Sequence, residues 1–483
     1  MRTSAIVRCA APEWNTLREI LFSRYPELEW ATFARFGWRE TTDQLVVTLA
    51  TIDPPSGSDL DDRVGHVAIS EPYSLRMALG AEKHSLAVGV IHSHPENCPP
   101  VASAIDDDMD SYYSSYLEGF APDRPYISLI ASTVRGDLSL GGRIFWRGEW
   151  LPVQHFAVER TPSTTWASQK PVNRQGRTRE RTRRLASAFG DEAADRLRRS
   201  TVAVIGAGGT GSAAIETLAR AGVGKLIIVD PESIGESNLE RVHGSCPDHV
   251  RDGISKVALA KEHVRAIDDS CVVQGFVGSL PQQEVVDALV TADVALGCTD
   301  QQHSRLALSD IAIRYLIPAI DCGVLLEGKD GKVTAQVIQL VRLLAADPCV
   351  LCRGMINPTQ IAQELMTDDE REQRRRAAME AESKGQDGNP YWHNLPQLNT
   401  VGYLTTMAGA LAAGYVIGWL AGRFDPPFER LQMNLVASYF DVTDNEQTPR
   451  PQCSCRRIRG WADQGNVDAL VTPPRHWPTA RLV

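Results

Sequence analysis

The chain has 483 residues, a length that predicts at least two domains with separate cores. Its formal net charge of −10 at neutral pH argues against a general nucleic-acid-binding protein. Ten cysteines are too few for a disulfide scaffold of this size, and Met1–Trp14 lacks the apolar core of a secretory signal. We therefore expect a soluble, cytoplasmic protein with no nucleic-acid partner.

Residues 1–160 alternate helical and strand patterns, which predicts a first α/β domain. Helical periodicity covers Glu13–Arg24 and Ser74–His84. Apolar segments with strand character lie at Trp30–Trp38, Gln44–Ile52 and Leu86–Ile91. The last of these strands matters most, because chemically active side chains follow it directly.

The end of that strand reads His92-Ser93-His94-Pro95, and Asp106 follows after a short loop. Two histidines two positions apart on an extended chain point the same way, so both imidazoles can bind one metal ion. With a carboxylate as third ligand, a zinc ion keeps its fourth position open for water, as catalytic zinc sites do. The alternative is a pair of ordinary polar histidines on a loop.

Together with Ser103-Ala-Ile-Asp106, this motif resembles that of the JAB/MPN (JAMM) metalloproteases, which cleave at the C-termini of ubiquitin-like proteins. The resemblance implies that His92, His94 and Asp106 hold zinc and that Ser103 orients the oxyanion. The spacing from His94 to Asp106 is one residue longer than the family's. This departure leaves the two following aspartates open as ligands, and it leaves an inactive domain open as well.

The same resemblance requires a glutamate as general base, which takes a proton from the attacking water and passes it to the leaving amine. Glu29, at the start of an upstream strand, fits this role best. Glu27 and Glu40 are its rivals.

Residues 161–178 are rich in Ser, Thr, Gln and Pro and lack periodicity, which predicts an exposed linker. The basic run Arg177–Arg184 then leads into a helix that ends near Gly190. Its charges alone fit a solvated helix face as well as a binding surface.

The second half of the chain is organised around a glycine-rich turn between two apolar strands. Val202–Ile205 is the first strand, a helix follows from about Ser212 to Ala221, and the second strand ends in Asp230. Glycines let the backbone approach phosphates, the helix N-terminus offers free N–H groups, and the acid can accept ribose hydroxyls. The pattern predicts half of a nucleotide-binding βαβ unit, whose turn contains Gly206, Gly208, Gly209 and Gly211.

Three further motifs follow in order: Ser237-Asn-Leu-Glu-Arg241, Lys256 and Cys298-Thr-Asp300. With the glycine-rich turn they resemble, over about residues 180–350, the ThiF/MoeB adenylyltransferases, which are related to ubiquitin-activating enzymes. The resemblance implies ATP-dependent adenylation of the C-terminal glycine of a ubiquitin-like or sulfur-carrier β-grasp protein, by a homodimer. A dehydrogenase that binds NAD would share the turn but not the later motifs.

The resemblance also implies a role for each polar residue in these motifs. The ribose would be bound by Asp230, the phosphate oxygens and developing charge by Asn238, Arg241 and Lys256, and Mg²⁺ by Asp300. In the family, an arginine ahead of the domain reaches the ATP phosphates, often across a dimer interface. Arg181 and Arg184 both qualify.

Four cysteines form two close pairs that lie about a hundred residues apart: Cys349, Cys352, Cys453 and Cys455. Four thiolates suit a tetrahedral structural zinc that clips the C-terminal segment to the domain. The same family resemblance extends to this site, although the family's second pair is commonly CxxC and not CxC. Four unrelated cysteines are the alternative.

Between the two pairs, residues 356–398 are a charged crossover segment in which Thr367–Gln386 predicts a mobile helix or lid. Many relatives have a cysteine in this segment that accepts the activated carboxylate as a thioester. Residues 353–452 contain no cysteine, and Cys246 is only a weak substitute. We therefore expect direct transfer to the thiol or sulfur of a partner, either a conjugating-enzyme-like protein or a sulfurtransferase.

Val401–Gly422 carries no charge and is long enough to span a bilayer. Because the segment is rich in Gly, Ala and Thr and lies where the family buries a long helix, we expect a core or dimer-interface helix and no membrane span.

These observations predict an α/β chain with a JAB/MPN domain at 1–160, a Rossmann-like doubly wound adenylation domain with a structural zinc at 179–458, and a tail at 459–483. The expected cofactors are ATP, Mg²⁺ and Zn²⁺, with one catalytic and one structural zinc. The expected function is a bifunctional enzyme of a bacterial-type modifier pathway that adenylates a ubiquitin-like C-terminus and also cleaves at such termini. Sulfur-carrier activation, with the first domain trimming the carrier, and a scaffold with an inactive first domain are the alternatives.

Overall fold

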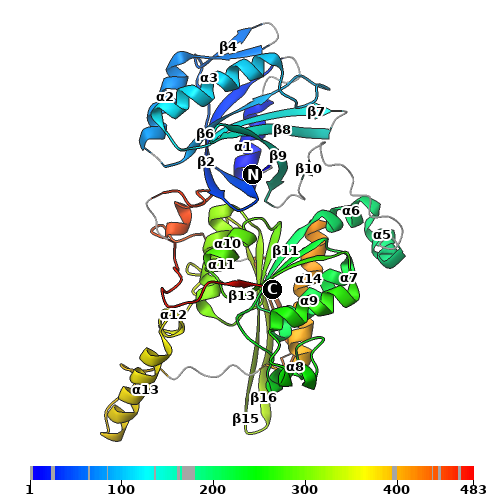
Figure 1. Ribbon diagram of the computed structural model, residues 1–483, viewed down its shortest axis with the longest axis vertical. Coiled ribbons are helices and arrows are strands. Elements are labelled where there is room, and N and C mark those ends of the chain that lie inside the picture. Colours follow the sequence, from blue (N-terminus) through cyan, green and yellow to red (C-terminus); the bar gives the residue numbers. More distant parts are fainter. Residues whose placement is uncertain are drawn as a thin grey trace.

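The computed structural model describes residues 4–483 except 23–27, 64–65, 84, 135–136, 160–163, 166–179, 394–399, 438, 444–447 and 466–468. Two α/β modules, each built on its own sheet, are stacked along the long axis of the molecule (Figure 1). Both modules mix helices and strands, as the sequence predicts.

The first module is a mixed sheet in the order β1-β3-β2-β6-β7-β8-β9-β10, and β1 also pairs with β9, so the sheet curls back on itself. All seven residues of β6 are buried, which explains the apolar run of its first five residues. The strands are β1 (Ser4–Cys9), β2 (Ala31–Glu40), β3 (Gln44–Asp53), β6 (Ala87–Ser93), β7 (Tyr126–Val134), β8 (Asp137–Trp146), β9 (Glu149–Val158) and β10 (Thr164–Thr165).

Helices cover both faces of this sheet. On one face, α1 (Ala11–Leu21) packs its apolar stripe of Trp14, Leu17 and Leu21 into a core with β2 and β6. On the other face, α2 (Glu71–Lys83) and α3 (Ala104–Phe120) bury tyrosine, methionine and leucine side chains. A small hairpin of β4 (Leu60–Arg63) and β5 (His66–Ile69) lies beside the sheet.

The second module is a nine-stranded sheet in the order β18-β17-β16-β15-β14-β11-β12-β13-β19. Its centre is parallel, as expected for a Rossmann-like fold, and antiparallel strands extend it on both sides. The strands are β11 (Thr201–Ile205), β12 (Lys225–Val229), β13 (Val272–Val277), β14 (Val294–Gly297), β15 (Ala319–Lys329), β16 (Lys332–Leu343), β17 (Arg430–Asn434), β18 (Tyr439–Thr443) and β19 (Arg481–Leu482).

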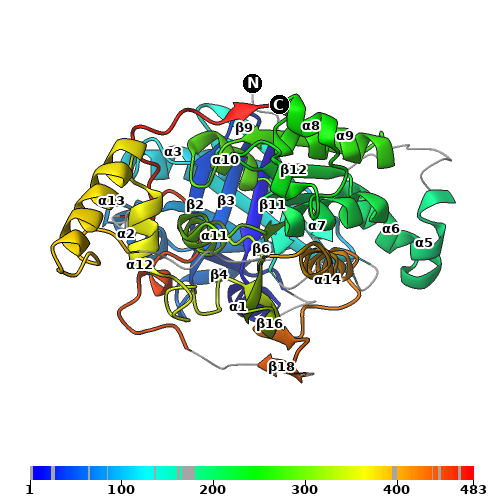
Figure 2. The same cartoon turned by 90° about the horizontal axis from the view of Figure 1, so that it is seen from below.

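Two groups of helices sandwich the parallel strands (Figure 2). One core contains side chains of α6 (Asp191–Arg199), α7 (Gly209–Ala221), α9 (Lys256–Ile267) and α14 (Gly402–Leu420). A second core, on the other face, contains side chains of α10 (Gln283–Leu289) and α11 (Gln302–Tyr315). The sheet is therefore doubly wound, which brings the carboxyl ends of its parallel strands to one crevice.

The apolar helix α14 packs directly on α7. A Cβ at Gly409 would lie 2.2 Å from the carbonyl oxygen of Thr210, so only glycine permits this close approach. Within the described residues, α14 is the one helix long and apolar enough to cross a membrane, with a mean hydropathy of 1.3 over a window that is 50% buried. Its packing against α7 is that of a core helix, as the sequence predicts.

Part of the predicted linker is a strand, because β10 lies inside it and pairs with β9. The other linker residues, 161–163 and 166–178, lie outside the described residues. The helix expected to end near Gly190 is α5 (Arg183–Phe189).

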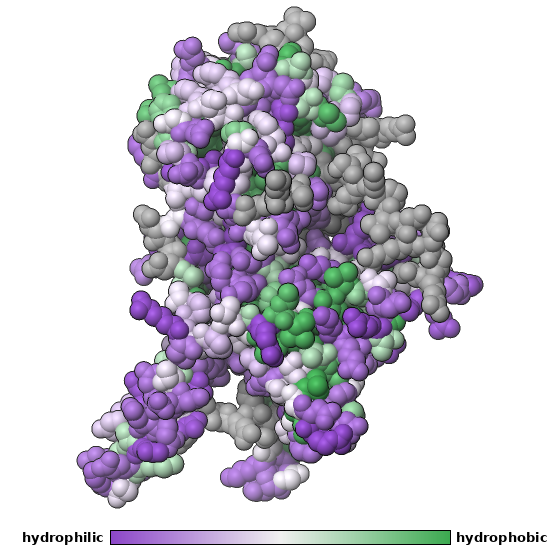
Figure 3. All heavy atoms as spheres, in the orientation of Figure 1, coloured by the Kyte–Doolittle hydropathy of each residue, from purple (hydrophilic) through white to green (hydrophobic). Residues whose placement is uncertain are grey.

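The crossover segment forms two helices, α12 (Pro358–Glu364) and α13 (Asp368–Ser383). Thr367 and Glu370 form a capping box that begins α13. Figure 1 shows α13 and the hairpin of β15 and β16 projecting from the second module, and Figure 3 shows that the α13 surface is mostly hydrophilic. The predicted charged helix is confirmed.

Buried polar side chains join the two modules. Arg8, which is 1% exposed, donates from its guanidinium to the carbonyls of Val290 (2.5 Å) and Ala292 (2.6 Å) in the second module. Burial lowers the pKa of Arg8 to about 10, so the group stays charged at neutral pH. Arg39 adds an ion pair with Asp287 at 2.8 Å. The junction therefore combines a buried arginine with half-buried ion pairs, and its contacts are specific.

Replacing Arg8 should test how much this junction contributes to folding. Arg8→Ala should lower the free energy of unfolding by about 2–5 kcal/mol, because two buried carbonyls lose their donor and a cavity remains. Chemical denaturation measures the change. As a control, Arg196→Ala removes an exposed i,i+4 pair with Glu192 and should cost at most about 0.5 kcal/mol. Equal costs for the two variants would contradict a junction built on Arg8.

The C-terminal tail, which carries no functional signal in the sequence, contacts both modules. Asp463 pairs with Arg39 of the first module, and the hydroxyl of Thr48 donates to the carbonyl of Gly460 at 2.7 Å. The tail then returns to the second module, where β19 pairs with β13 and forms the edge of the sheet.

Candidate functional site

A cavity of about 670 Å³ opens at the carboxyl ends of the parallel strands in the second module. Its wall includes the glycine-rich turn and all five polar residues that the sequence singles out for nucleotide binding: Asp230, Asn238, Arg241, Lys256 and Asp300. These side chains come from four separate stretches of the chain, and the sheet brings them to one place.

The glycine-rich turn shapes the floor of the cavity. Gly206 has a φ of +97° and leaves no room for a side chain, because a Cβ would lie 2.6 Å from the carbonyl oxygen of Cys298. Gly208 and Gly209 line the cavity where α7 begins, so the unpaired N–H groups of that helix face it. Gly211 is not among the lining residues. A Cβ there would lie 1.8 Å from the Gly206 carbonyl oxygen, so this glycine serves packing.

Asp230 follows β12 and is 6% exposed. Its two carboxylate oxygens accept hydrogen bonds from the backbone N–H groups of Ala207 (2.8 Å) and Glu232 (2.9 Å). Burial raises the pKa of this carboxyl. Each oxygen keeps a further lone pair toward the cavity, which is what hydroxyl donors such as those of ribose require.

Lys256 is the first residue of α9 and is 6% exposed, and its ammonium contacts the carboxylate of Glu232. Glu232, which sequence reasoning missed, therefore orients the lysine within the cavity. The nearby turn is also internally bonded. The side-chain oxygen of Asn238 accepts from the N–H of Gly235 at 3.1 Å, and Arg241 donates to the carbonyl of Ser237 at 2.8 Å.

The sequence motifs also do not identify a second arginine of the cavity. Arg305, on the first turns of α11, lines the wall and lies 3.3 Å from the carboxylate of Asp321. Asp321 is 2% exposed, and burial raises its pKa. The only signal in the sequence is that Arg305 follows the predicted Asp300 by little more than one helical turn. Gln360 and Glu364 of α12 complete the rim.

The arginines ahead of the domain do not line this cavity. Arg181 pairs with Asp268 at 3.2 Å, and Arg184 is exposed. Neither arginine is among the described residues that line the cavity of its own chain.

Cysteines near the cavity are poor nucleophiles. Burial raises the pKa of Cys298 to about 12, and burial likewise raises the pKa of Cys322. Cys246 precedes the short helix α8 (Pro247–Arg251), and its Sγ lies 3.4 Å from Nδ1 of His249. It is not among the residues that line the cavity.

The first module brings the predicted metal ligands together. His92 is the second-last residue of β6, His94 follows the strand, and Asp106 lies on the first turn of α3. Nε2 of His92 lies 3.0 Å from one oxygen of Asp106, and Nε2 of His94 lies 3.3 Å from the other. All three side chains are buried, and their ligand atoms lie within 4.8 Å of one another.

The donor set fits a zinc ion. Among the described residues, neither ring nitrogen of His92 makes a hydrogen bond, although Nε2 lies close to Asp106, and such buried nitrogens are costly unless another group binds there. Nδ1 of His94 lies 3.3 Å from the carbonyl oxygen of Pro99, a contact that leaves Nε2 free for a metal. The neighbouring aspartates face elsewhere, because Asp107 pairs with Arg143 at 2.6 Å and Asp108 is exposed.

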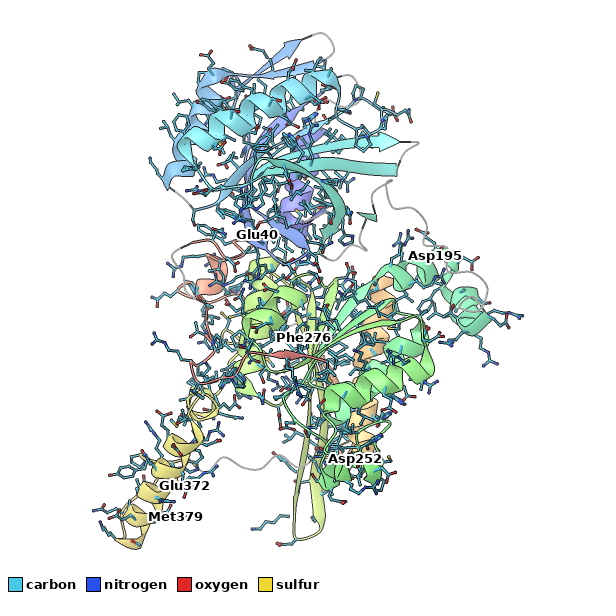
Figure 4. The ribbon with its side chains drawn as sticks, in the orientation of Figure 1. Glu40, Asp195, Asp252, Phe276, Glu372 and Met379 are labelled. Atoms are coloured by element: carbon cyan, nitrogen blue, oxygen red, sulfur yellow. The ribbon has the colours of Figure 1, made fainter. Side chains whose placement is uncertain are left out.

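Other predicted residues of this site are placed as follows. Glu29 is half-buried just before β2 and lies within electrostatic range of His94. Glu40 lies at the far end of β2, at the module junction (Figure 4), and pairs with Arg147, which removes it as a rival. Glu27 lies outside the described residues. Ser103 caps α3 by accepting from the N–H of Asp106, and its hydroxyl hydrogen remains available to donate.

The four paired cysteines also meet. Sγ of Cys349 lies 3.6 Å from that of Cys453, and Sγ of Cys352 lies 3.8 Å from that of Cys455. A hydrogen bond from Cys455 lowers the pKa of Cys349, which favours a thiolate. All four ligand atoms lie within 4.8 Å of one another, so the set fits a tetrahedral zinc.

The cavity and the histidine cluster lie at opposite ends of the two modules. His92 pairs with Ala31 at the start of β2, whereas Arg39 near its end contacts the second module, so roughly 26 Å of strand separates the cluster from the junction. In the second module, Thr201 at the start of β11 bonds to Asp293 at the junction, and Ile205 at its end lines the cavity, roughly 13 Å further on.

Comparisons with known proteins bear on the second module. The model of the ThiF family matches residues 181–456, more than half of the chain. The sulfur carrier protein ThiS adenylyltransferase of Bacillus subtilis is 30% identical over 134 residues, which cover 28% of this chain and 40% of the relative. The SAMP-activating enzyme E1 of Haloferax volcanii is 32% identical over 168 residues, covering 35% of this chain and 58% of the relative. The chain thus spans about half the length of these curated relatives. A crystal structure of E. coli MccB with ATP shares 16% identity and a TM-score of 0.43, over 59% of this chain and 75% of its own.

Proposed function

The chain belongs to the ThiF family, and on this premise we propose that its second module adenylates the C-terminal carboxylate of a ubiquitin-like or sulfur-carrier protein. The observation that carries the proposal is the single cavity that unites the glycine-rich turn with the five predicted polar residues. Two similar proteins support the substrate class, since one is named for adenylating the sulfur carrier ThiS and the other for activating SAMP.

In this reaction, an oxygen of the substrate carboxylate attacks the α-phosphorus of ATP, and the bond to the departing pyrophosphate breaks. Two anions must approach each other, so positioning and positive charge supply most of the catalysis. Asp230 binds the ribose, while Arg241 and Lys256 hold the phosphate oxygens. A magnesium ion held by Asp300 would offset the charge of the pyrophosphate. In a homodimer, Arg181 or Arg184 of a second copy would add a further cation.

ATP–pyrophosphate exchange tests the proposal. Exchange should require a β-grasp protein that ends in glycine and should stop when that glycine is deleted. A chain that binds ATP but shows no exchange with any glycine-ended ubiquitin-like or sulfur-carrier protein of its source organism would overturn the adenylation proposal.

The acceptor of the activated carboxylate is proposed to be a partner's thiol or sulfur. The raised pKa values of Cys298 and Cys322 argue against an internal thioester at either position. If the acceptor belongs to a conjugating-enzyme-like partner, the product is a modifier–protein conjugate. If a sulfurtransferase is the partner, its persulfide displaces AMP, and a second thiol then forms a disulfide with the enzyme sulfur and releases the carrier as a thiocarboxylate. Mass spectrometry of the carrier distinguishes this product from the conjugate.

For the first module we propose a zinc metallopeptidase that cleaves at ubiquitin-like C-termini. Its support is the buried set of His92, His94 and Asp106, with Glu29 nearby. A zinc ion held by the three ligands would activate water and polarise the scissile carbonyl. Glu29 takes the proton of the attacking water and returns it to the leaving amine, and the Ser103 hydroxyl donates to the developing oxyanion. The reaction would expose or release the glycine that the second module activates.

The distance between the two sites has a consequence for the order of events. A tail of ten extended residues spans at most about 35 Å, which does not cover both strand lengths and the junction between them. A modifier that is cleaved at the first site must therefore dissociate before it is activated at the second.

Mixing variants tests this separation. In an equimolar mixture of His92→Ala/His94→Ala chains and Asp300→Ala chains, each variant supplies one intact active site. When the concentration of each intact site equals that in the wild-type sample, the mixture should convert a C-terminally extended precursor to adenylate at the wild-type rate. Mass spectrometry of the precursor follows both steps. A mixture that is much slower than the wild type at equal site concentration would contradict free release between the steps.

A further inference from the structure

The crossover segment contributes a carboxylate to the edge of the nucleotide cavity. Glu364, the last residue of α12, lines the cavity together with Gln360. It lies more than sixty residues after Asp300 in the chain, on a segment that the sequence predicts only as a charged helix or lid.

Glu364 binds the first turn of α11. One oxygen of its carboxylate accepts from the backbone N–H of Gln302 at 3.0 Å, and the other accepts from that of His303 at 2.9 Å. The second oxygen also lies 2.7 Å from Nδ1 of the His303 ring. Although burial acts in the opposite direction, these hydrogen bonds lower the pKa of Glu364, so the group is ionised at neutral pH.

The carboxylate of Glu364 caps the N-terminus of α11, a role that the N-cap residue of this helix does not fill. The N-cap residue Gln301 makes no capping hydrogen bond with its side chain, which leaves the first N–H groups of the helix without a local partner. A distant carboxylate fills that role and also opposes the positive end of the helix dipole. Gln360 donates to Glu364 at 3.0 Å and so orients it.

The first turn of α11 follows Asp300 directly. Asp300 lines the cavity, and the N–H of Gln301 donates to the hydroxyl of Thr299 at 3.1 Å, so the backbone here is a tight turn that leads straight into the helix. Any motion of the first turn therefore moves Asp300 relative to Asp230, which follows β12, and to Lys256 on α9.

We propose that Glu364 is a positioning residue for the magnesium ligand: by capping α11 from the crossover segment, it holds Asp300 in place, so the Mg²⁺ dependence of ATP binding relies on that segment. The inference rests on the proposed adenylation function, and in particular on Asp300 as the magnesium ligand. It also gives the crossover segment a role in nucleotide binding in addition to any role as a lid.

Calorimetric titration with ATP, in Mg²⁺ and in EDTA, tests the inference without any modifier. In the wild type, Mg²⁺ should tighten ATP binding. Glu364→Ala should weaken MgATP binding by roughly 10- to 100-fold, the range found for residues that orient metal ligands, and should leave ATP binding in EDTA unchanged. Glu364→Gln keeps the shape and one acceptor and should fall between the two.

Two further variants distinguish the loss of positioning at Asp300 from a general loosening of the crossover segment. Glu370→Ala removes the capping box of α13 in the same crossover segment, but Glu370 lines no part of the described cavity wall, so it should leave MgATP binding unchanged. Adding Glu364→Ala to Asp300→Ala should cause no further loss, because the ligand that Glu364 positions is already gone.

The outcomes are distinguishable. If Mg²⁺ tightens ATP binding to the wild type and Glu364→Ala behaves identically, Glu364 does not position the site, and the adenylation proposal stands. An equal loss in Mg²⁺ and EDTA, or full additivity with Asp300→Ala, also overturns the positioning role. If Mg²⁺ has no effect on ATP binding to the wild type, both the magnesium assignment and this inference fall.

Discussion

Asp300→Ala should lower the rate of ATP–pyrophosphate exchange by roughly 10²- to 10³-fold, the loss typical of removing one preorganised electrostatic group from an active site. The reason is geometric. Asp300 stands between the end of β14 and the start of α11, on the same cavity wall as Lys256 and Arg241. Without its carboxylate, the magnesium that offsets the pyrophosphate charge loses its protein ligand. The exchange rate at saturating carrier protein measures the effect.

A matched control for this variant is available on the projecting helix. Glu372→Ala removes an exposed carboxylate of α13 that pairs only weakly with Arg376, far from the cavity (Figure 4). It should leave exchange unchanged. If Asp300→Ala retained an exchange rate close to that of the control, Asp300 would not be the magnesium ligand and the assignment of the cavity wall would need revision.

His92→Ala/His94→Ala should abolish cleavage of a linear fusion to the C-terminus of the modifier and should leave ATP–pyrophosphate exchange intact. Two of three zinc ligands are removed, and the metal is the group that activates water. Exchange survives because the adenylation cavity lies beyond the module junction, at the other end of β11. Gel-based cleavage and pyrophosphate exchange on the same preparation give both readings.

An exposed histidine provides the control for this second prediction. His476 lies in the C-terminal tail, away from the histidine cluster, so His476→Ala should leave both cleavage and pyrophosphate exchange unchanged. Wild-type cleavage by the double variant would show that another group performs the reaction. If the wild-type protein does not cleave the fusion although both sites are intact, the scaffold alternative is favoured for the first module.

The local parts of this structure follow from the sequence because their signals are local. Val202–Ile205 and Val294–Gly297 are continuous apolar runs, which parallel strands covered on both faces require, and both are strands in the structure. The two histidines of the first module also meet as their spacing predicts. In these cases a few neighbouring residues determine the geometry, whereas the meeting of the two cysteine pairs is a long-range contact that the sequence analysis proposed from the zinc chemistry of four thiolates.

The rest could not be predicted because it depends on contacts between distant segments. Arg8 meets carbonyls 282 and 284 residues away, and nothing near Arg8 in the sequence marks it as buried. Glu364 caps a helix that begins 62 residues earlier. The tail reads as an irregular segment, yet it docks on both modules. Hydrophobic periodicity reports which face of an element is buried and not what lies against it.

The central claim is that one chain joins an adenylation site to a separate catalytic zinc site, and zinc content tests it most directly. Metal analysis of the purified wild type should give about two zinc ions per chain, one at the histidine cluster and one at the four cysteines. His92→Ala/His94→Ala should retain about one. About one zinc ion in both proteins would contradict the account, because the first module would then hold no metal and the chain would be an adenylating enzyme alone.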